Sequence, residues 1–136
     1  MTYLVLYLAT FIVFLGIDFL GLGKVVKPVF EKHIPDLLLE SPRIGPALVF
    51  YAFYVMGLLW FVSVPAVADE RGLLWVAGNG AIIGALAFGT YEFTSLAVTK
   101  GWSWEMVAVD LTSGIVMTAS SAAAGVAITR ALGFAL

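Results

Sequence analysis

Cysteine is absent from this chain of 136 residues, histidine occurs once, and charged residues make up only 12% of it. Without cysteine there is no disulfide, thiolate nucleophile, iron–sulfur cluster or thiolate zinc site. The lone His33 provides no histidine pair, so no haem or metal cofactor is expected. The net charge of −2 indicates no basic surface for nucleic acid.

Apolar side chains are abundant instead. Hydrophobic residues make up 62% of the chain, and its mean hydropathy is +1.04. Soluble domains are about half apolar and one quarter charged, and a soluble protein of this size cannot bury so much apolar surface. The composition therefore predicts an integral membrane protein, which we expect to form a single transmembrane domain over residues 1–136.

Four long uncharged runs are the main pattern in the chain. A membrane-spanning helix needs about 20 apolar residues, and these runs lack the alternation of barrel strands. We expect helices at about 2–23, 46–67, 72–98 and 104–131. No basic residue precedes the first run and no small-residue cleavage site follows it, so we expect this helix to remain in the mature protein.

The connection over residues 24–45 is the longest one expected. It and its boundary carry Pro28, Pro35, Pro42 and Pro46. Prolines interrupt helices, and the alternation of apolar and charged residues here is typical of a segment on the membrane surface. The predicted fold is a compact all-α bundle of four transmembrane helices with one longer proline-rich interfacial loop.

Basic residues indicate the orientation. The first and third connections contain five of the seven lysines and arginines, and the opposite side contains only Arg71 and Arg130. Cytoplasmic loops are enriched in these residues. We therefore expect the first and third loops in the cytoplasm and both termini in the periplasm.

Polar residues inside the expected helices gather at one depth, roughly one to two turns from the basic loops. Three of them are the acids Asp18, Glu92 and Asp110. Acids inside a membrane are costly and usually face the interior of a bundle. The candidate ligand-binding residues at this level are Asp18, Tyr51, Tyr54, Tyr91, Glu92, Ser95, Asp110 and Ser113.

These acids have structural interpretations as well. Asp18 is only a few residues from Lys24 of the first loop, so its carboxyl group can extend to water at the membrane surface. Asp110 is near the start of the last helix, where a carboxylate can interact with the free backbone N–H groups. With no lysine or arginine inside the membrane, at least one acid is expected to be protonated or to meet a cation. Binding a cation, relaying a proton and holding the polar head of an amphipathic ligand all remain open.

Small residues recur on the last two helices at spacings that favour close helix packing. The candidates for helix packing are Gly80, Gly84, Gly114, Ser121 and Gly125. The Glu-x-x-His ligands of di-metal bundles are absent, and no Ser–His–Asp arrangement lies in the membrane. No metal site and no hydrolytic site are therefore expected.

Several motifs are familiar. They are Phe14-Leu15-Gly16-Ile17-Asp18, Gly89-Thr90-Tyr91-Glu92-Phe93-Thr94-Ser95-Leu96-Ala97, Gly101-Trp102-Ser103-Trp104 and Val109-Asp110. With these motifs, nearly the whole chain resembles the bacterial predicted-membrane-protein family called domain of unknown function 2177 (DUF2177). The resemblance implies a four-helix protein of the bacterial inner membrane and places the family's polar motifs on Asp18, Glu92 and Asp110. It implies no activity.

The chain departs from that family pattern at four positions. The pattern has Asp and Asn where this chain has Glu92 and Ser95, and tryptophan where it has Gly21 and Ser113. The loss of two large side chains near the acids is expected either to open a cavity or groove there or to flatten a surface for a partner helix.

The leading functional hypothesis is a non-catalytic inner-membrane component. It would use its small-residue faces and an acidic cytoplasmic pocket to bind a hydrophobic or amphipathic ligand, such as a membrane lipid, or a neighbouring subunit or second copy. The alternative is a lipid-modifying enzyme or small proton-coupled transporter that uses Glu92 with Asp18 and Asp110. A third hypothesis is a structural bundle whose acids are paired internally.

Overall fold

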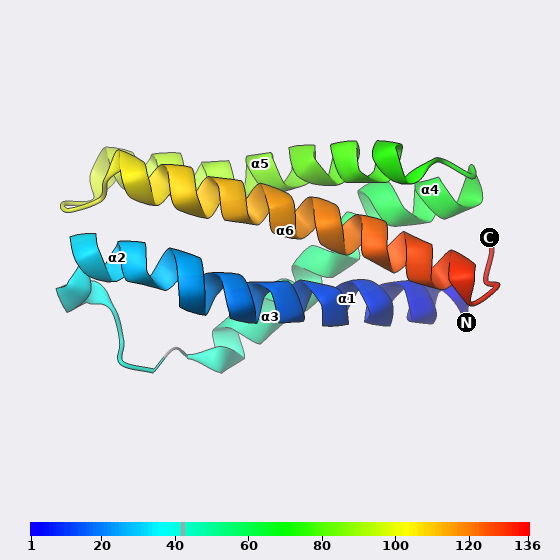
Figure 1. Ribbon diagram of the computed structural model, residues 1–136, viewed down its shortest axis with the longest axis horizontal. Coiled ribbons are helices and arrows are strands. Elements are labelled where there is room, and N and C mark those ends of the chain that lie inside the picture. The colour runs from blue at the N-terminus through cyan, green and yellow to red at the C-terminus, as the bar shows by residue number, and fades with distance from the viewer. Residues whose placement is uncertain (42) are drawn as a thin grey trace.

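The computed structural model describes residues 1–41 and 43–136, so the expected helix breaker Pro42 lies outside the described residues. Four continuous helices are long and apolar enough to cross a membrane: Thr2–His33, Ile44–Ala68, Leu73–Val98 and Trp104–Ala131. They pack side by side, and no strand occurs over the described ranges (Figure 1). The prediction of an all-α bundle of four long apolar helices is confirmed.

Two of the four helices are divided into segments. The first consists of α1 (Thr2–Gly21), the π-helical turn η1 (Leu22–Val26) and α2 (Lys27–His33), and a short 3₁₀ turn, η2 (Pro35–Leu37), follows it. The second consists of α3 (Ile44–Leu58), the π-helical turn η3 (Leu59–Ser63) and α4 (Val64–Ala68). The last two are α5 (Leu73–Val98) and α6 (Trp104–Ala131).

The prediction that the first helix ends near residue 23 is wrong, because this helix continues to His33. A proline ring normally clashes with the carbonyl four residues earlier and removes a hydrogen bond. Just before Pro28, the Lys27 N–H donates to the carbonyl of Leu22, five residues back, and this wider turn accommodates the proline. The connection to the next helix is correspondingly shorter than the predicted loop of residues 24–45.

The second helix repeats this arrangement. The Val64 N–H donates to the carbonyl of Leu59, again five residues back, and Pro65 follows directly. Both π-helical turns therefore come immediately before a proline inside a membrane-length helix. Such turns are a known way to bend a helix without breaking it.

Helix α6 is the centre of the bundle and packs against α5 along most of its length and against α1. Small residues allow this proximity. A Cβ atom at Gly84 would lie 2.9 Å from the Gly114 carbonyl oxygen, and one at Gly80 would lie 3.2 Å from Ala119 Cα. Gly125 gives the same close approach to Thr10 of α1.

Helix α3 is inclined to the other long helices of the bundle (Figure 1). The helix Ile44–Ala68 crosses the bundle obliquely, and α3 diverges from α5 toward the end that carries α2 (Figure 1). Its main contacts are with α1 and the adjoining η3 rather than with α5. This divergence leaves space between α3, α5 and α2.

The two ends of the bundle are closed by different contacts. At one end the termini lie together, where the Thr2 hydroxyl donates to the Ala135 carbonyl at 3.0 Å. Arg130 Nη2 also donates there to the carbonyls of Ala66 (3.1 Å) and Arg71 (2.6 Å). At the other end, Val26, Phe30, Ile34 and Met106 form a small second core under the α5–α6 turn.

Candidate functional site

The first part of the candidate site joins α1 to α3. Tyr51 Oη donates a hydrogen bond to Asp18 Oδ1 at 3.1 Å. Phe14, one turn before Asp18, is fully buried, and its ring packs edge-on against Tyr51 with 5.1 Å between centroids. Asp18 is thus directed toward α3 rather than along its own helix toward Lys24.

The second part joins α5 to the α5–α6 turn. Glu92 is fully buried, and its Oε1 accepts a hydrogen bond from Trp102 Nε1 at 3.0 Å. Trp102 returns to the bundle because Gly101 adopts φ +84°, a conformation that favours glycine. The indole packs edge-on against Phe30 (5.3 Å) and Tyr91 (5.7 Å). Glu92 Oε2 has no hydrogen-bond partner among the described residues.

Asp110 of α6 lies between these two parts. Its carboxyl group is close enough to those of Glu92 and Asp18 to interact with both. It also lines a cavity together with Tyr51 and Tyr91. The structure therefore brings the three predicted acids together, from three different helices, with Asp110 at the centre.

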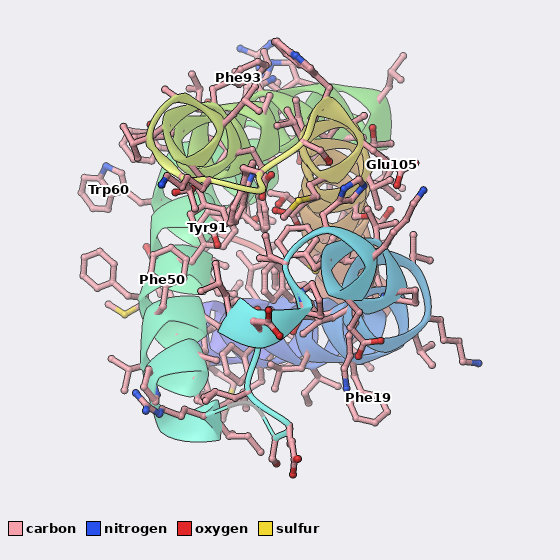
Figure 2. All side chains as sticks on the ribbon, turned by 90° about the vertical axis from the view of Figure 1, so that its left-hand side faces the viewer. Phe19, Phe50, Trp60, Tyr91, Phe93 and Glu105 are labelled. Carbon is pink, nitrogen blue, oxygen red and sulfur yellow. The ribbon has the colours of Figure 1, made fainter. Side chains whose placement is uncertain are left out.

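Two cavities adjoin Asp110. The larger of these, about 810 Å³, lies between α2, the following connection, α3 and α5. Its wall is mainly apolar. The polar members of the wall are Lys27, Arg43, Tyr51, Tyr91 and Asp110. Figure 2 looks onto this end of the bundle, with Tyr91 near its middle and Trp60 projecting outward from the helix Ile44–Ala68.

The smaller cavity, about 490 Å³, lies between the first helix and α6. Asp18, Asp110 and Ser113 are polar members of its wall. Gly21 also lines it, and a Cβ atom there would have no neighbour within 4 Å. The small residues at positions 21 and 113 were expected either to open a cavity or groove or to flatten a surface for a partner helix. In the structure, a cavity lies at both positions. The two cavities share Leu22, Val26, Phe88 and Asp110 in their walls.

Three predicted ligand-binding residues lie away from both cavity walls. Tyr54 lies deeper, where its hydroxyl pairs with that of Thr118 at 3.0 Å. Glu92 is fully buried and bonds to Trp102 instead. Ser95 has no side-chain hydrogen bond to the acids among the described residues. Asp18, Tyr51, Tyr91, Asp110 and Ser113 are the predicted residues that line a cavity.

The predicted packing residues are placed at helix contacts. Gly80 and Gly84 face α6, Gly114 lies against the Phe88 ring, and Gly125 lies against Thr10. Ser121 is buried, and its hydroxyl donates within the helix to the Met117 carbonyl at 2.6 Å. The stripe of small residues is thus occupied by contacts within the chain.

Sequence reasoning missed three residues of the site. Trp102 was not among the predicted site residues, although its spacing of ten residues from Glu92 across a short turn is compatible with contact. Lys27 and Arg43 were used only as basic residues of the first loop, to predict the orientation in the membrane. No local pattern identifies these two as cavity residues, because their position depends on the continued first helix and the inclined α3.

A family model agrees with this architecture. The model described as "Predicted membrane protein (DUF2177)" matches residues 3–127. No curated protein and no solved structure matches the chain.

Proposed function

Because this chain belongs to DUF2177, a family described only as predicted membrane proteins, we propose its function from the site: it binds an amphipathic molecule at the end of the bundle that carries α2. One observation supports this most directly. Two mainly apolar cavities meet at Asp110, and polar groups occupy only part of each wall. Ligand sites in proteins typically combine an apolar wall with a few polar groups that fix orientation.

The polar groups have separate roles in this proposal. Asp110 is the central contact because it belongs to both walls, with Asp18 and Tyr51 beside it. Glu92 bonds to Trp102, lines neither cavity and does not reach the ligand. For this reason, a non-catalytic role is proposed ahead of an enzyme or transporter that depends on Glu92.

The proposal favours a ligand over a neighbouring subunit. Small-residue faces are a common basis for helix association in membranes. Here, however, Gly80, Gly84 and Gly125 already pack against α6 or α1. We also propose a bacterial inner-membrane location with both termini periplasmic, supported by the basic residues of the first and third loops.

The test is mass spectrometry of everything that co-migrates with the protein in mild detergent. Gly21→Trp and Ala47→Trp place a large side chain in the smaller and larger cavity, respectively. Gly16→Trp and Val49→Trp are the matched controls, because neither residue lines a cavity. A stoichiometric amphipathic molecule retained by the controls and lost from the cavity variants is the expected result.

Other outcomes contradict the proposal. A stoichiometric membrane subunit and no small molecule would favour the accessory-subunit alternative. Wild-type protein free of any companion, together with altered lipid composition of the cells in Glu92→Gln, would favour lipid chemistry.

A further inference from the structure

Two basic side chains line the larger cavity near the loop end of the bundle: Lys27 of α2 and Arg43, directly before α3. Within the described part of the chain, the ion pair of Lys27 is with Glu31 at 3.8 Å, and both side chains are about half exposed. No ion pair of Arg43 occurs in that part. Exposed pairs of this kind contribute little, so both cations are available to an anion.

The cations and the tyrosines of the larger cavity lie at two different levels. The cations lie at the start of α2 and α3, and Tyr51 follows two turns into α3, roughly 10 Å deeper. Tyr91 is at a similar level, and its hydroxyl has no hydrogen-bond partner among residues 1–41 and 43–136. The walls of both cavities include the apolar side chains Leu22, Val26 and Phe88, which range from the level of Lys27 to one turn below Tyr91.

We infer that the ligand is a membrane phospholipid, with its phosphate held between Lys27 and Arg43 and an acyl chain in the apolar cavities. This rests on the proposed function and specifies its ligand class. Phosphate, then ester carbonyls, then hydrocarbon is the order of a phospholipid from the surface inward. The cations complement the phosphate, the Tyr91 hydroxyl at the deeper level complements an ester carbonyl, and the apolar side chains around them complement the hydrocarbon.

The charges also fix the orientation of the ligand. Arginine binds phosphate oxygens through two parallel hydrogen bonds, and lysine binds them as a point charge. The cations lie at the loop end and the acids Asp18 and Asp110 at the inner end, and this arrangement favours the phosphate at the loop end. The volume of about 810 Å³ lies within the usual range of ligand cavities, about 300–1,000 Å³.

The experiment is native mass spectrometry of the delipidated protein after incubation with defined probes. Phosphatidylglycerol carries the phosphate, diacylglycerol has the same chains without it, and inorganic phosphate has no chains. The double variant Lys27→Gln/Arg43→Gln removes both cations. Lys24→Gln/Lys100→Gln is the control, because it removes two cations from the same end that line neither cavity.

We expect phosphatidylglycerol to bind wild-type protein and the control equally, and the cavity variant at least about tenfold more weakly, since both charge-assisted contacts to the phosphate are lost. Diacylglycerol bound as tightly as phosphatidylglycerol, and unaffected by the variants, would overturn this inference but leave the proposed function intact. Binding of inorganic phosphate alone would identify an ion site and also overturn it. Binding of no probe, with no companion molecule in the purified protein, would reject both.

Discussion

At the scale of single residues, the contact between α5 and α6 depends on the absence of side chains. Gly84 is the most restrictive position among those that face α6, because its neighbours are the backbone atoms of Gly114 and Ile115. Backbone atoms cannot move away as the end of a flexible side chain can. Even a methyl group is therefore expected to separate the two helices.

Gly84→Ala should lower the free energy of unfolding by about 1–3 kcal/mol, as overpacking of a tight core does. Gly78→Ala on the same helix is the matched control, because a Cβ there has no neighbour within 4 Å. Unfolding in mixed micelles, followed by circular dichroism, measures both. Equal effects of the two substitutions would show that Gly84 is not a packing position.

Glu92 is a buried acid with one hydrogen bond to a neighbouring side chain. Trp102→Phe removes the donor to Oε1 while keeping the ring contacts with Phe30 and Tyr91. We expect a loss of about 1–3 kcal/mol of stability, the usual cost of an unsatisfied buried polar group. Trp104→Phe is the control, because Trp104 is 69% exposed. If both variants unfold alike, the Trp102–Glu92 bond does not stabilise the site.

At the scale of elements, α2 is held to the start of α6 by a small charged cluster. Glu105 Oε1 lies 3.0 Å from His33 Nε2 and 3.3 Å from Lys32 Nζ. Figure 2 shows Glu105 at the edge of the bundle, close to the ribbon of α2. This cluster fixes the end of the continued first helix, and α2 forms one wall of the larger cavity.

Glu105→Gln should loosen the end of α2 without unfolding the bundle. Because the chain lacks cysteine, a single Ile34→Cys substitution gives a unique probe at a position only 7% exposed. We expect its maleimide labelling to accelerate a few-fold in Glu105→Gln. Glu31→Gln is the control, since Glu31 pairs only within α2 among the described residues. Unchanged labelling in Glu105→Gln would contradict a restraining role for the cluster.

The elements also show the extent to which sequence predicts this structure. Four spans follow from uncharged runs, because hydrocarbon excludes charge over about 20 residues. The end of the first helix was missed, because Pro28 signals a break unless the preceding turn widens, and no residue pattern marks that widening. Position along the helices predicted that Asp18, Glu92 and Asp110 lie at one depth, but it could not show that Glu92 lines neither cavity.

At the scale of the whole molecule, the termini share one end of the bundle and the first and third connections share the other (Figure 1). The cavities lie toward the end with the connections. The larger cavity depends on the inclination of the helix Ile44–Ala68, a property of packing that local sequence does not encode. The orientation across the membrane determines which leaflet supplies the ligand.

The basic loops predict that this end faces the cytoplasm. In intact cells, a cysteine in place of Lys100 should resist a membrane-impermeant maleimide until the cells are opened. A cysteine in place of Glu70, in the turn before α5, should react at once. The reverse pattern would place the cavities toward the periplasmic leaflet and contradict the predicted orientation.

The central claim is that an amphipathic molecule occupies the joined cavities. Photo-crosslinking tests it most directly, in cells supplied with a photoactivatable fatty acid, with the modified residues mapped by mass spectrometry. Bulk lipid reaches outward residues such as Trp60, which is 76% exposed, whereas Met117 in the wall of the smaller cavity is 5% exposed. We predict crosslinks at Met117 and Phe88 that disappear in Gly21→Trp but persist in Gly16→Trp. Crosslinks confined to outward residues such as Trp60 would show that no such molecule enters the bundle.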